Sequence, residues 1–360
     1  MRVLVVNAGS SSLKLRVVVG ERVTAKRDIP AGRDGFDASG LADFLADVEV
    51  DAVGHRVVHG GTRFTRPTRL DDDAIKALRD LTDLAPLHQP KSLAGIDAVG
   101  AALPGAPAVA CFDTAFHAGL PAAASTYALP AEWRQRWEVR RYGFHGLSHS
   151  YAARRAAEVV GPAADLRVVV CHLGAGASLC AVAAGRSVDT TMGFTPLEGL
   201  VMATRSGSVD PGLLLWLQEH AGLTAHQIAD TLEHQSGLLG LGGSSDMREL
   251  LDGADRGDPR ARLAIDVYVH RLVAGIAAMA AALGGLGVLV FTGGVGERAP
   301  AIRRAAAQRL AYHGVALDEA LNASVSGDGE ISSAGSPVRT LVIEAREDLE
   351  IARGVRAVLG

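Results

Sequence analysis

The feature that most constrains the fold is one supersecondary unit that occurs twice, about half a chain apart. Residues 2–23 (RVLVVNAGSSSLKLRVVVGERV) read as an apolar strand, a small polar turn and a second strand. Residues 167–188 (RVVVCHLGAGASLCAVAAGRSV) repeat this plan with a glycine-containing turn. A repeated unit of this kind indicates a duplicated domain, and the alternative is two unrelated hairpins. At 360 residues the chain also exceeds what one hydrophobic core usually supports, so we expect two domains.

Strand-like runs alternate with helical patterns along the rest of the chain. Apolar runs typical of strands occupy residues 50–58, 107–113, 287–294 and 337–344. Helical patterns occupy residues around 91–102, 150–161, 249–251, 261–283 and 348–359. This alternation is typical of α/β domains, and we therefore predict the α/β class.

Composition and charge argue against several classes of protein. The formal net charge is −4, and acidic and basic residues are interspersed. Proteins that bind nucleic acid or a membrane surface usually carry a basic face, so we expect neither partner. An anionic ligand must then be bound by local arginines. Glycines interrupt the apolar run at residues 272–291, which favours a core helix followed by a buried strand over a membrane span.

Cysteine usage and the N-terminus indicate the cell compartment. Cys111, Cys171 and Cys180 are odd in number, form no CxxC pair and lie in apolar stretches. We interpret them as buried thiols in a reducing compartment, and a reactive thiol is the alternative. The apolar run at the N-terminus is far too short for a signal peptide. The sequence therefore predicts a soluble, cytoplasmic protein.

The first hairpin has a polar surface that suits phosphate oxygens. A period of two places Ser10, Ser12 and Lys14 on one face and apolar side chains on the other. Two hydroxyls, an ammonium group and the amides of the turn can all donate to phosphate. Asn7 adds a side-chain oxygen at the end of the first strand. An ordinary polar turn is the alternative.

Two further glycine-rich turns follow apolar strands, at residues 172–178 and 292–297. A strand, a glycine turn and a helix in this order commonly bind nucleotides, and we expect the second turn to lead to a helix near Pro300. The sequence contains neither a GxxxxGK(S/T) motif nor the protein-kinase signature set, which excludes both of those kinase classes.

Polar clusters lie at glycine-bounded strand ends or before helices, at residues 54–61, 112–117, 141–149 and 204–211. Each has an ordinary structural explanation when it is taken alone. His145 and His149 could suggest a metal pair, but the sequence has no HExxH motif and shows no third ligand for them. Together the clusters favour a site, because α/β proteins place ligands at strand ends.

These segments together resemble the acetate kinase family, within the acetate and sugar kinase/actin superfamily. The resemblance runs nearly end to end and is carried, in order, by VLVVNAGSSSLKLR, GHRVVHGG, LAPLHQPKSLAGI, ACFDTAFH, RRYGFHGLSHSYAA, CHLGAGAS, SVDTTMGFTPLEGLVMATRSGSVDP, SGLLGLGGSSDMR, FTGGVGER and EDLEIAR. It implies two duplicated ribonuclease-H-like (actin-like ATPase) domains with an interdomain cleft, and a homodimer. The implied domains are residues 1–114 plus 348–360, and residues 115–347.

The resemblance implies a reversible, in-line transfer of the γ-phosphoryl group of Mg-ATP to acetate, which gives acetyl phosphate and ADP. Carboxylic acids of this kind have a pKa of about 4 to 5 and are ionised at pH 7, so the nucleophile needs no general base. An anion must instead approach a polyanion. Such a site should be rich in Arg, His and Mg²⁺ and should act by positioning and charge stabilisation.

The matching positions give the candidate catalytic residues their roles. Arg56 and Arg205 would bind the substrate carboxylate and the phosphoryl group in transfer, for which a planar fork of donors is suited. His145 would stabilise the transition state without acting as a base. Asp113 would orient an arginine or a metal-bound water.

The resemblance also assigns the metal, nucleotide and acyl contacts. Asn7 and Glu347 would hold Mg²⁺, with Mn²⁺ as the alternative, through the hard oxygen ligands that these ions prefer. ATP or ADP would contact Ser10, Ser12, Lys14, His172, Leu173, Gly174, Ala175, Gly176, Asp246, Met247, Arg248, Gly294, Val295, Gly296, Glu297 and Arg298. The substrate pocket would be lined by Arg56, Val58, Leu87, Phe144 and Pro196. Valine at position 58, instead of alanine, favours acetate over propionate by roughly 1–3 kcal/mol.

Several residues depart from the usual pattern of the family. Ala175, Arg298 and Gln89 occupy positions where the family usually has asparagine, and Asp348 stands where it often has glutamate. The stretch between residues 14 and 56 is shorter than usual. These changes keep the transfer residues in place but leave nucleotide affinity and base preference open.

Three alternative functions compete for the same residues. A kinase that prefers propionate or butyrate would need a wider pocket than Val58 indicates. A nucleotide-binding module without turnover would not need a carboxylate site, so the joint presence of Arg56, Asp113, His145 and Arg205 argues against it. A metal-dependent hydrolase built on two histidines has the weakest support.

Overall fold

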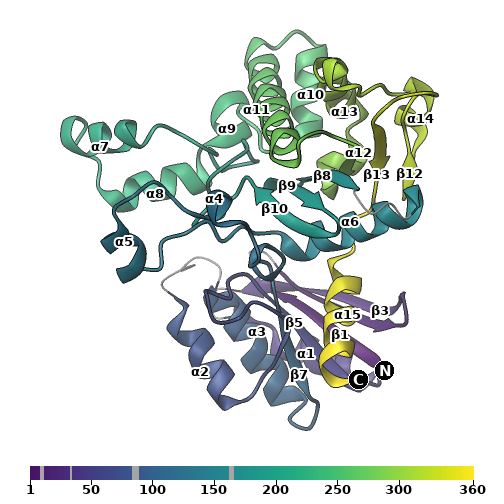
Figure 1. The fold of residues 1–360 in the computed structure, drawn as a ribbon. Helices are drawn as coiled ribbons and strands as arrows, with labels where there is room; N and C mark the ends of the chain where they lie inside the picture. The colour runs from purple at the N-terminus through teal and green to yellow at the C-terminus, as the bar shows by residue number, and fades with distance from the viewer. Residues whose placement is uncertain (9–11, 33–34, 83–88, 162–165) are drawn as a thin grey trace. The chain divides into compact units, whose positions relative to one another are not determined.

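The computed structural model describes residues 1–8, 12–32, 35–82, 89–161 and 166–360. The chain forms two compact units (Figure 1). The first contains Met1–Ala118, Phe144–Tyr151 and Arg346–Gly360, and the second contains Gly119–Gly143 and Ala152–Ala345. The domain boundaries expected at 114/115 and 347/348 remain a prediction.

A mixed sheet forms the centre of the first unit. Its described strands are β1 (Arg2–Ala8), β2 (Ser12–Val19), β3 (Arg22–Gly32), β4 (Gly35–Phe36), β5 (Ala52–Val57), β6 (Thr68–Arg69) and β7 (Ala108–Phe112). They lie in the order β4-β3-β2-β1-β5-β7-β6. β2 is antiparallel to both of its neighbours, β1 and β3, whereas β5 is parallel to β1 and to β7, and β6 is antiparallel to β7.

The second unit repeats this arrangement. Its described strands are β8 (Arg167–Leu173), β9 (Ala177–Ala183), β10 (Arg186–Thr190), β11 (Val288–Thr292), β12 (Gly329–Glu330) and β13 (Arg339–Val342). They lie in the order β10-β9-β8-β11-β13-β12, with β8, β11 and β13 parallel and the other neighbours antiparallel. Chain order and strand direction match β3-β2-β1-β5-β7-β6, so the fold is a duplicated α/β domain, as the repeated hairpins predict.

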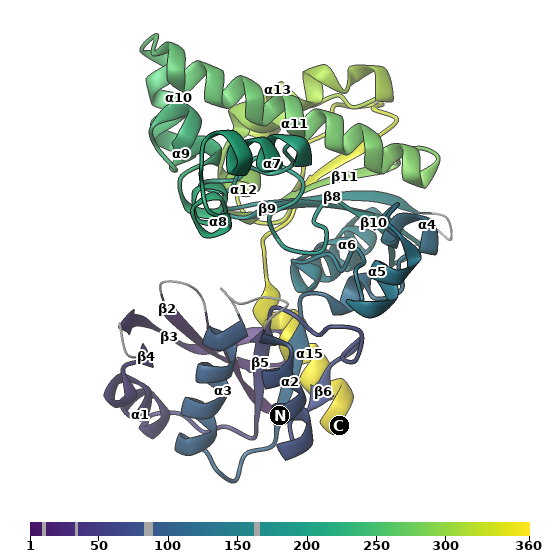
Figure 2. The ribbon, with the colours of Figure 1, turned by 90° about the vertical axis from the view of Figure 1, so that its left-hand side faces the viewer.

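Helices cover both faces of the first sheet (Figures 1 and 2). α1 (Ala38–Ala46) and α3 (Gln89–Ala102) pack on one face, with α2 (Asp72–Asp80) against α3, and α15 (Glu347–Leu359) packs on the other. In β1, β5 and β7 buried residues follow one another almost without interruption, as expected for strands that are covered on both faces. In β2 the predicted apolar face is buried, whereas Lys14 is exposed and Ser12 is half-buried. Ser10 lies outside the described residues.

Two glycines allow α15 to lie close to the sheet. A Cβ atom on Gly54 of β5 would lie 2.6 Å from Cγ2 of Ile351 and 2.7 Å from Cγ2 of Val355. A Cβ atom on Gly354 of α15 would lie 2.9 Å from Sγ of Cys111 in β7. Only glycine leaves room for this approach. The C-terminal helix is thus part of the core of the first unit.

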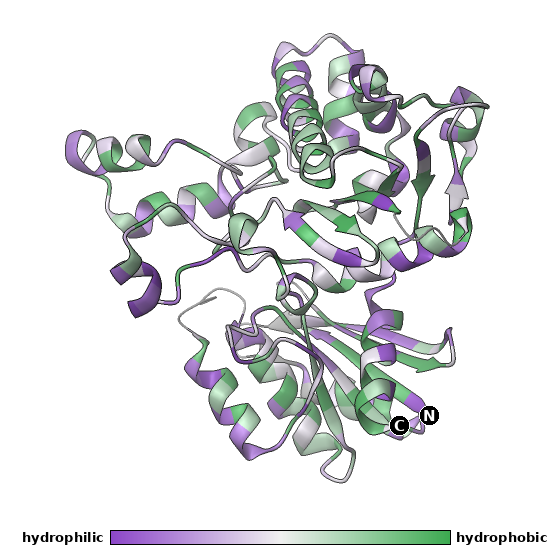
Figure 3. Cartoon of the chain, in the orientation of Figure 1, coloured by the Kyte–Doolittle hydropathy of each residue, from purple (hydrophilic) through white to green (hydrophobic). Residues whose placement is uncertain are grey.

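Most of the helices among the described residues lie in the second unit. They are α4 (Ala122–Ser125), α5 (Ala131–Arg136), α7 (Pro211–His220), α8 (Ala225–His234), α9 (Gly237–Gly242), α10 (Met247–Asp255), α11 (Pro259–Leu283), α12 (Gly293–Arg298), α13 (Pro300–Arg309) and α14 (Glu319–Ser324). α11 is long and apolar enough to cross a membrane, but it packs against β9, α9 and α10. It is followed by the buried strand β11, which confirms the core helix and buried strand predicted for this run. Figure 3 shows how hydrophobic residues recur along both sheets.

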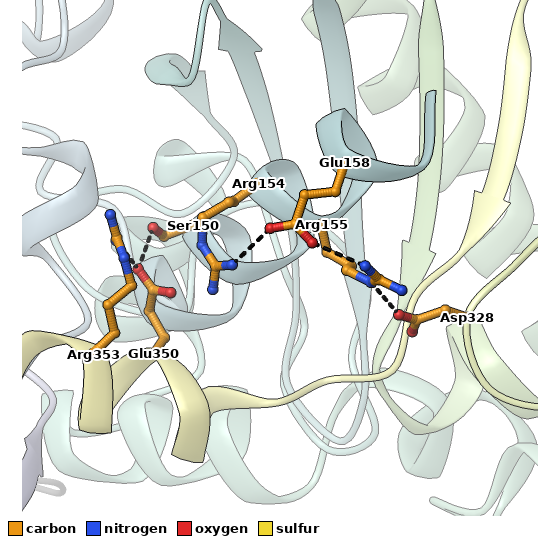
Figure 4. Close-up of polar contacts among 7 residues, drawn as sticks. All are labelled: Ser150, Arg154, Arg155, Glu158, Asp328, Glu350 and Arg353. Atoms are coloured by element: carbon orange, nitrogen blue, oxygen red, sulfur yellow. Dashed lines mark hydrogen bonds and ion pairs between the residues drawn. The ribbon is translucent and has the colours of Figure 1, made fainter. Parts of the chain in front are cut away.

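α6 (Gly146–Val160) contributes its first residues to the first unit and the rest to the second. In the first unit, Oγ of Ser150 donates to Oε1 of Glu350 at 2.8 Å (Figure 4). In the second unit, Arg155 pairs with Glu158 at 2.9 Å and with Asp328 at 2.7 Å. Each half of α6 therefore contacts its own unit through polar side chains, Ser150 in the first unit and Arg155 in the second.

The cysteines confirm the interpretation as buried thiols. Cys111, Cys171 and Cys180 are fully buried, and none forms a disulfide. Burial raises the pKa of the Cys111 and Cys180 thiols to about 12 and also raises that of Cys171. A thiol with so high a pKa is almost entirely protonated at neutral pH and is a poor nucleophile.

The turn between β9 and β10 offers a test of backbone strain. Ala184 and Gly185 both have positive φ, 47° and 76°, which is the two-residue turn that favours Asn-Gly. An L-residue with a side chain other than Asn or Asp costs about 1–2 kcal/mol there. We expect Ala184→Asn to stabilise the second unit by roughly 0.5–1 kcal/mol. Urea unfolding measures the change.

The same substitution at Ala282, an exposed position within α11, is the matched control. Asparagine has a lower helix propensity than alanine, so Ala282→Asn should destabilise the protein by about 0.5 kcal/mol. Equal effects of both substitutions would contradict the assignment of strain to Ala184.

Candidate active site

Arg56 is the centre of a polar cluster in the first unit. It lies near the end of β5, and Asp113 directly follows the parallel neighbour β7. Nε of Arg56 donates to Oδ1 of Asp113 at 3.0 Å, and Nη2 donates to Oδ2 at 2.6 Å. Asp113 is 1% exposed, and the side chain of Arg56 is 19% exposed. This bidentate pair fixes the plane of the guanidinium.

Asn7 and Glu347 complete the cluster. Oδ1 of Asn7, in β1, accepts from Nη1 of Arg56 at 3.2 Å, and Nδ2 of Asn7 donates to Glu347 at 3.4 Å. Glu347 is the first residue of α15, and its Oε2 lies 3.7 Å from Nε of Arg56. Burial alone would lower the pKa of Arg56, but the charges of Asp113 and Glu347 raise it overall. The structure brings together four predicted residues that come from separate segments.

The chemistry of this cluster fits a divalent cation. Two carboxylates face one guanidinium, which leaves one surplus negative charge. The oxygens of Glu347 and Asn7 are of the hard type that Mg²⁺ prefers. Among the described residues, no group of three or more His, Cys, Asp or Glu side chains could hold a metal on its own. Mg²⁺ usually takes most of its ligands from water and substrate phosphates, so one or two protein oxygens suffice.

His145 lies in the first unit, directly before α6. Its backbone has a φ of 56°, in the left-handed region, and its ring is half-buried. The ring centroids of His145 and His149 are 6.5 Å apart, and the ring of the fully buried His149 packs edge-on against His117. The left-handed backbone sets the direction in which the His145 side chain leaves the chain.

The predicted pocket residues are distributed over both units. Val58 and Phe144, in the first unit, are 8% and 1% exposed, and the Phe144 ring packs edge-on against His59. Pro196 is buried in the second unit, and its carbonyl accepts from Nη1 of Arg205 at 3.0 Å. The structure thus joins Arg205 to Pro196. Leu87 lies outside the described residues.

Two of the predicted nucleotide segments lie side by side in the second unit. β8 and β11 are parallel neighbours, with Thr292 opposite His172. A Cβ atom on Gly293 would lie 2.9 Å from the carbonyl oxygen of Leu173, so glycine is needed where the segments meet. A Cβ atom on Gly294 would have no neighbour within 4 Å, and Gly294 is exposed. In the adjacent turn, the N–H of Gly174 donates to the carbonyl of Gly176 at 2.9 Å, and Ala175 accepts from Ala203.

The segment predicted as a glycine-rich turn at 292–297 is a short helix, α12, and this prediction was wrong. The N–H of Gly293 donates to Oε1 of Glu297 at 2.9 Å, which caps the helix from within. The same oxygen accepts from the N–H of Ala345 at 3.0 Å. The helix predicted near Pro300 is α13, which begins there.

The third predicted nucleotide segment begins α10. The side chain of Asp246 accepts from the N–H of Arg248 at 2.9 Å and pairs with its guanidinium at 2.6 Å. Met247 is 4% exposed, so its side chain belongs to the core. Arg248 and Arg298 are both exposed.

Comparison with known proteins then decides the family. The model of the acetokinase family matches residues 38–353, which is most of the chain. The chain belongs to the acetokinase family. It is 51% identical over 319 residues to an acetate kinase of Gloeobacter violaceus, with 88% of this chain and 78% of the relative covered.

Two solved structures of kinases have the same fold. An acetate kinase from Porphyromonas gingivalis is 36% identical with a TM-score of 0.90, and the match covers 100% of both chains. A propionate kinase from Francisella tularensis is 35% identical with a TM-score of 0.92, and the match covers 99% of this chain and 100% of the other. The fold therefore does not separate a preference for acetate from one for propionate.

Sequence reasoning about this acetokinase missed three residues that hold the candidate site. Glu233 pairs with Arg205, with 3.2 Å between Oε2 and Nε, and lies 28 residues further along the chain. Arg303, which is 1% exposed, donates to the carbonyls of Gly296 and Glu297 at 2.9 and 2.8 Å. Nε2 of His117 lies 3.0 Å from the carbonyl oxygen of Phe144, the residue directly before His145. Only His117 lay in a polar cluster that the sequence singled out.

Gln89 departs from the asparagine that the resemblance leads one to expect. It is fully buried, and its Nε2 donates to the carbonyls of His59 and Leu78 at 3.3 Å each. The longer side chain therefore ties the start of α3 to α2 and to the segment that follows β5. This is a structural role within the first unit.

Proposed function

We propose that this acetokinase is an acetate kinase, which transfers the γ-phosphoryl group of ATP reversibly to acetate. The observation that carries the proposal is the guanidinium of Arg56, which a buried carboxylate holds in a fixed plane at the ends of parallel strands. A carboxylate substrate is already ionised, so the reaction needs charge neutralisation and orientation instead of a base. The Arg56 cluster can provide both the positive charge and the orientation.

Arg56 has donors to spare for an anion. A guanidinium carries five N–H groups, of which two donate to Asp113 and one donates to Asn7. The remaining two, one on each terminal nitrogen, suit the two oxygens of a carboxylate or phosphoryl group. Asp113 orients the fork, and Arg56 binds the substrate. Arg205 supplies a second guanidinium, and His145 donates to the transferring group.

We propose Asn7 and Glu347 as the protein ligands of Mg²⁺, with Mn²⁺ as the alternative metal. The surplus negative charge of the cluster and its oxygen donors support this assignment. When bound with ATP, the metal neutralises phosphate charge. Ser10, Ser12, Lys14, the segment 172–176, residues 246–248 and α12 are proposed to bind the nucleotide.

The acyl specificity of the pocket follows from Val58 and Phe144. Both are buried, so an added methylene on the substrate would need space that these side chains occupy. The resulting preference for acetate over propionate amounts to roughly 1–3 kcal/mol in the transition state. The alternative, a kinase that prefers propionate or butyrate, requires the opposite order of kcat/KM.

A hydroxamate assay with Mg-ATP and acetate, propionate or butyrate tests the function. We expect acetyl hydroxamate to form fastest, and we expect His145→Ala and Arg205→Ala to remove most of the activity. A higher kcat/KM for propionate or butyrate would favour the alternative kinase. Binding of ATP without acyl phosphate from any of the three acids would favour a nucleotide-binding module.

We also propose a homodimer, and α7 is the candidate contact. None of its residues is buried, although it carries four leucines and a tryptophan, and Leu215 and Trp216 are 59% and 52% exposed. Exposed apolar groups of this density commonly mark interfaces. We expect Leu215→Glu with Trp216→Glu to convert a dimer into monomers, as measured by analytical ultracentrifugation.

Tyr312, which is 72% exposed on another element, provides the control. Tyr312→Glu should leave the oligomeric state unchanged. A wild-type protein that sediments as a monomer at micromolar concentration would refute the homodimer.

A cytoplasmic location is proposed on the strength of three buried cysteines without a disulfide.

A further inference from the structure

Three residues of the first unit, Phe144, His145 and Gly146, form a strap that is fastened at both ends to one neighbouring segment. At one end, the carbonyl of Phe144 lies 3.0 Å from Nε2 of His117. At the other end, the N–H of Gly146 donates to the carbonyl of Asp113 at 2.9 Å. A Cβ atom on Gly146 would lie 2.1 Å from that carbonyl oxygen, so only glycine fits at this contact.

The contact with Phe144 fixes the tautomer of His117. The residue is fully buried in the short 3₁₀ helix Ala115–His117, and burial lowers the pKa of its imidazole to about 4. The ring is therefore neutral at physiological pH. A carbonyl oxygen can only accept, so Nε2 must carry the proton and donate it. The ring of His149 packs edge-on against that of His117, with the centroids 5.7 Å apart.

The residue held between these two contacts has an unfavourable backbone. His145 has a φ of 56°, and a left-handed backbone is unfavourable for a residue with a side chain. A strained conformation persists only where its surroundings hold it in place. The donor on His117 holds the peptide group that joins Phe144 to His145, so it orients the side chains on both sides of that group.

We propose that His117 is a positioning residue, which through the Phe144 carbonyl sets the direction of His145 and the place of the Phe144 ring. The inference rests on the proposed function, in which His145 stabilises the transition state and Phe144 lines the acyl pocket. His117 itself contacts neither substrate. Its loss should lower kcat for acyl transfer and change the selectivity between acetate and propionate, with little effect on the KM for ATP.

The experiment compares His117→Leu with His117→Gln in the full-length protein. Leucine keeps the bulk and removes the donor, whereas the amide nitrogen of glutamine can replace Nε2. We expect His117→Leu to lower kcat on the order of 10–100-fold, because small misplacements of a positioned group have effects of this size. His117→Gln should recover kcat to within about three-fold of the wild type.

His55 provides the matched control. It is also buried in the first unit, on β5, and burial likewise lowers its pKa to about 4. His55→Leu should reduce stability to a similar extent but leave kcat and acyl selectivity close to those of the wild type. Thermal unfolding of each variant separates folding defects from kinetic ones.

Each outcome decides the proposal. A loss of kcat in His117→Leu that His55→Leu matches, or that glutamine fails to recover in a folded protein, overturns it. If His117→Leu does not fold, the comparison of His117→Gln with His117→Asn replaces it, because asparagine places its amide too far from Phe144. Equal kcat in those two variants then overturns the proposal. If wild-type protein forms no acyl phosphate, the proposed function itself fails.

Discussion

Replacing Arg56 by glutamine is expected to lower kcat/KM for acetate by about 10³-fold, while the affinity for ATP changes little. Glutamine keeps a single NH2 group but removes the positive charge and the planar fork that Asp113 orients. The acetate anion must then approach the γ-phosphate of ATP with one compensating positive charge fewer. The loss should appear in kcat as well as in KM, because the charge acts on the transition state.

Steady-state kinetics with acetate and Mg-ATP, together with nucleotide binding by calorimetry, measure these changes. Arg79 supplies the control, because it forms an ion pair with Asp97 in the same unit but is 51% exposed. Arg79→Gln should leave both quantities unchanged. A loss below ten-fold for Arg56→Gln would show that Arg56 does not bind the reacting groups.

Replacing Asp113 by alanine is expected to destabilise the first unit by about 3–5 kcal/mol, the usual effect of leaving one member of a buried ion pair without its partner. Asp113 is 1% exposed and provides two of the acceptors that Arg56 uses. Glu347 lies 3.7 Å from Nε and can compensate only in part.

Urea unfolding followed by far-UV circular dichroism measures this change. Trp133, Trp137 and Trp216 all lie in the second unit, so tryptophan fluorescence alone would not report on the first unit. Asp97→Ala removes the carboxylate of the exposed pair and should change stability by less than about 1 kcal/mol. Similar effects at both positions would contradict the assignment of the Arg56–Asp113 pair as a buried one.

Much of the fold could be predicted from the sequence, because the strands and most helices carry periodic apolar residues. The first hairpin is an example, since burial in β2 follows the predicted alternation. α12 could not be predicted in this way. Three of its six residues are glycine, which is a poor helix former. It is held by contacts of Glu297 with the N–H groups of Gly293 and Ala345 and of Arg303 with the carbonyl of Gly296, which no apolar period indicates.

The residues of the candidate site were predicted from family motifs, because sequence spacing does not show which distant side chains contact each other. Arg56 and Asp113 were both named, but they are separated by 57 positions, and only the parallel register of β5 and β7 brings them to one edge. Glu233 pairs with Arg205, and Nε2 of His117 lies 3.0 Å from the Phe144 carbonyl, and no local spacing in the sequence marks such contacts. The catalytic roles themselves remain predictions.

The place of α15 has a consequence for synthesis on the ribosome. Gly54 and Cys111 pack against a helix that is made from the last residues of the chain. At about 5–20 residues per second, the sheet of the first unit waits roughly 10–50 s for that helix after its own strands have been made. All residues of the second unit precede α15 in the chain. They are therefore available for folding before α15, and one face of the N-terminal sheet lacks its covering helix until α15 has been made.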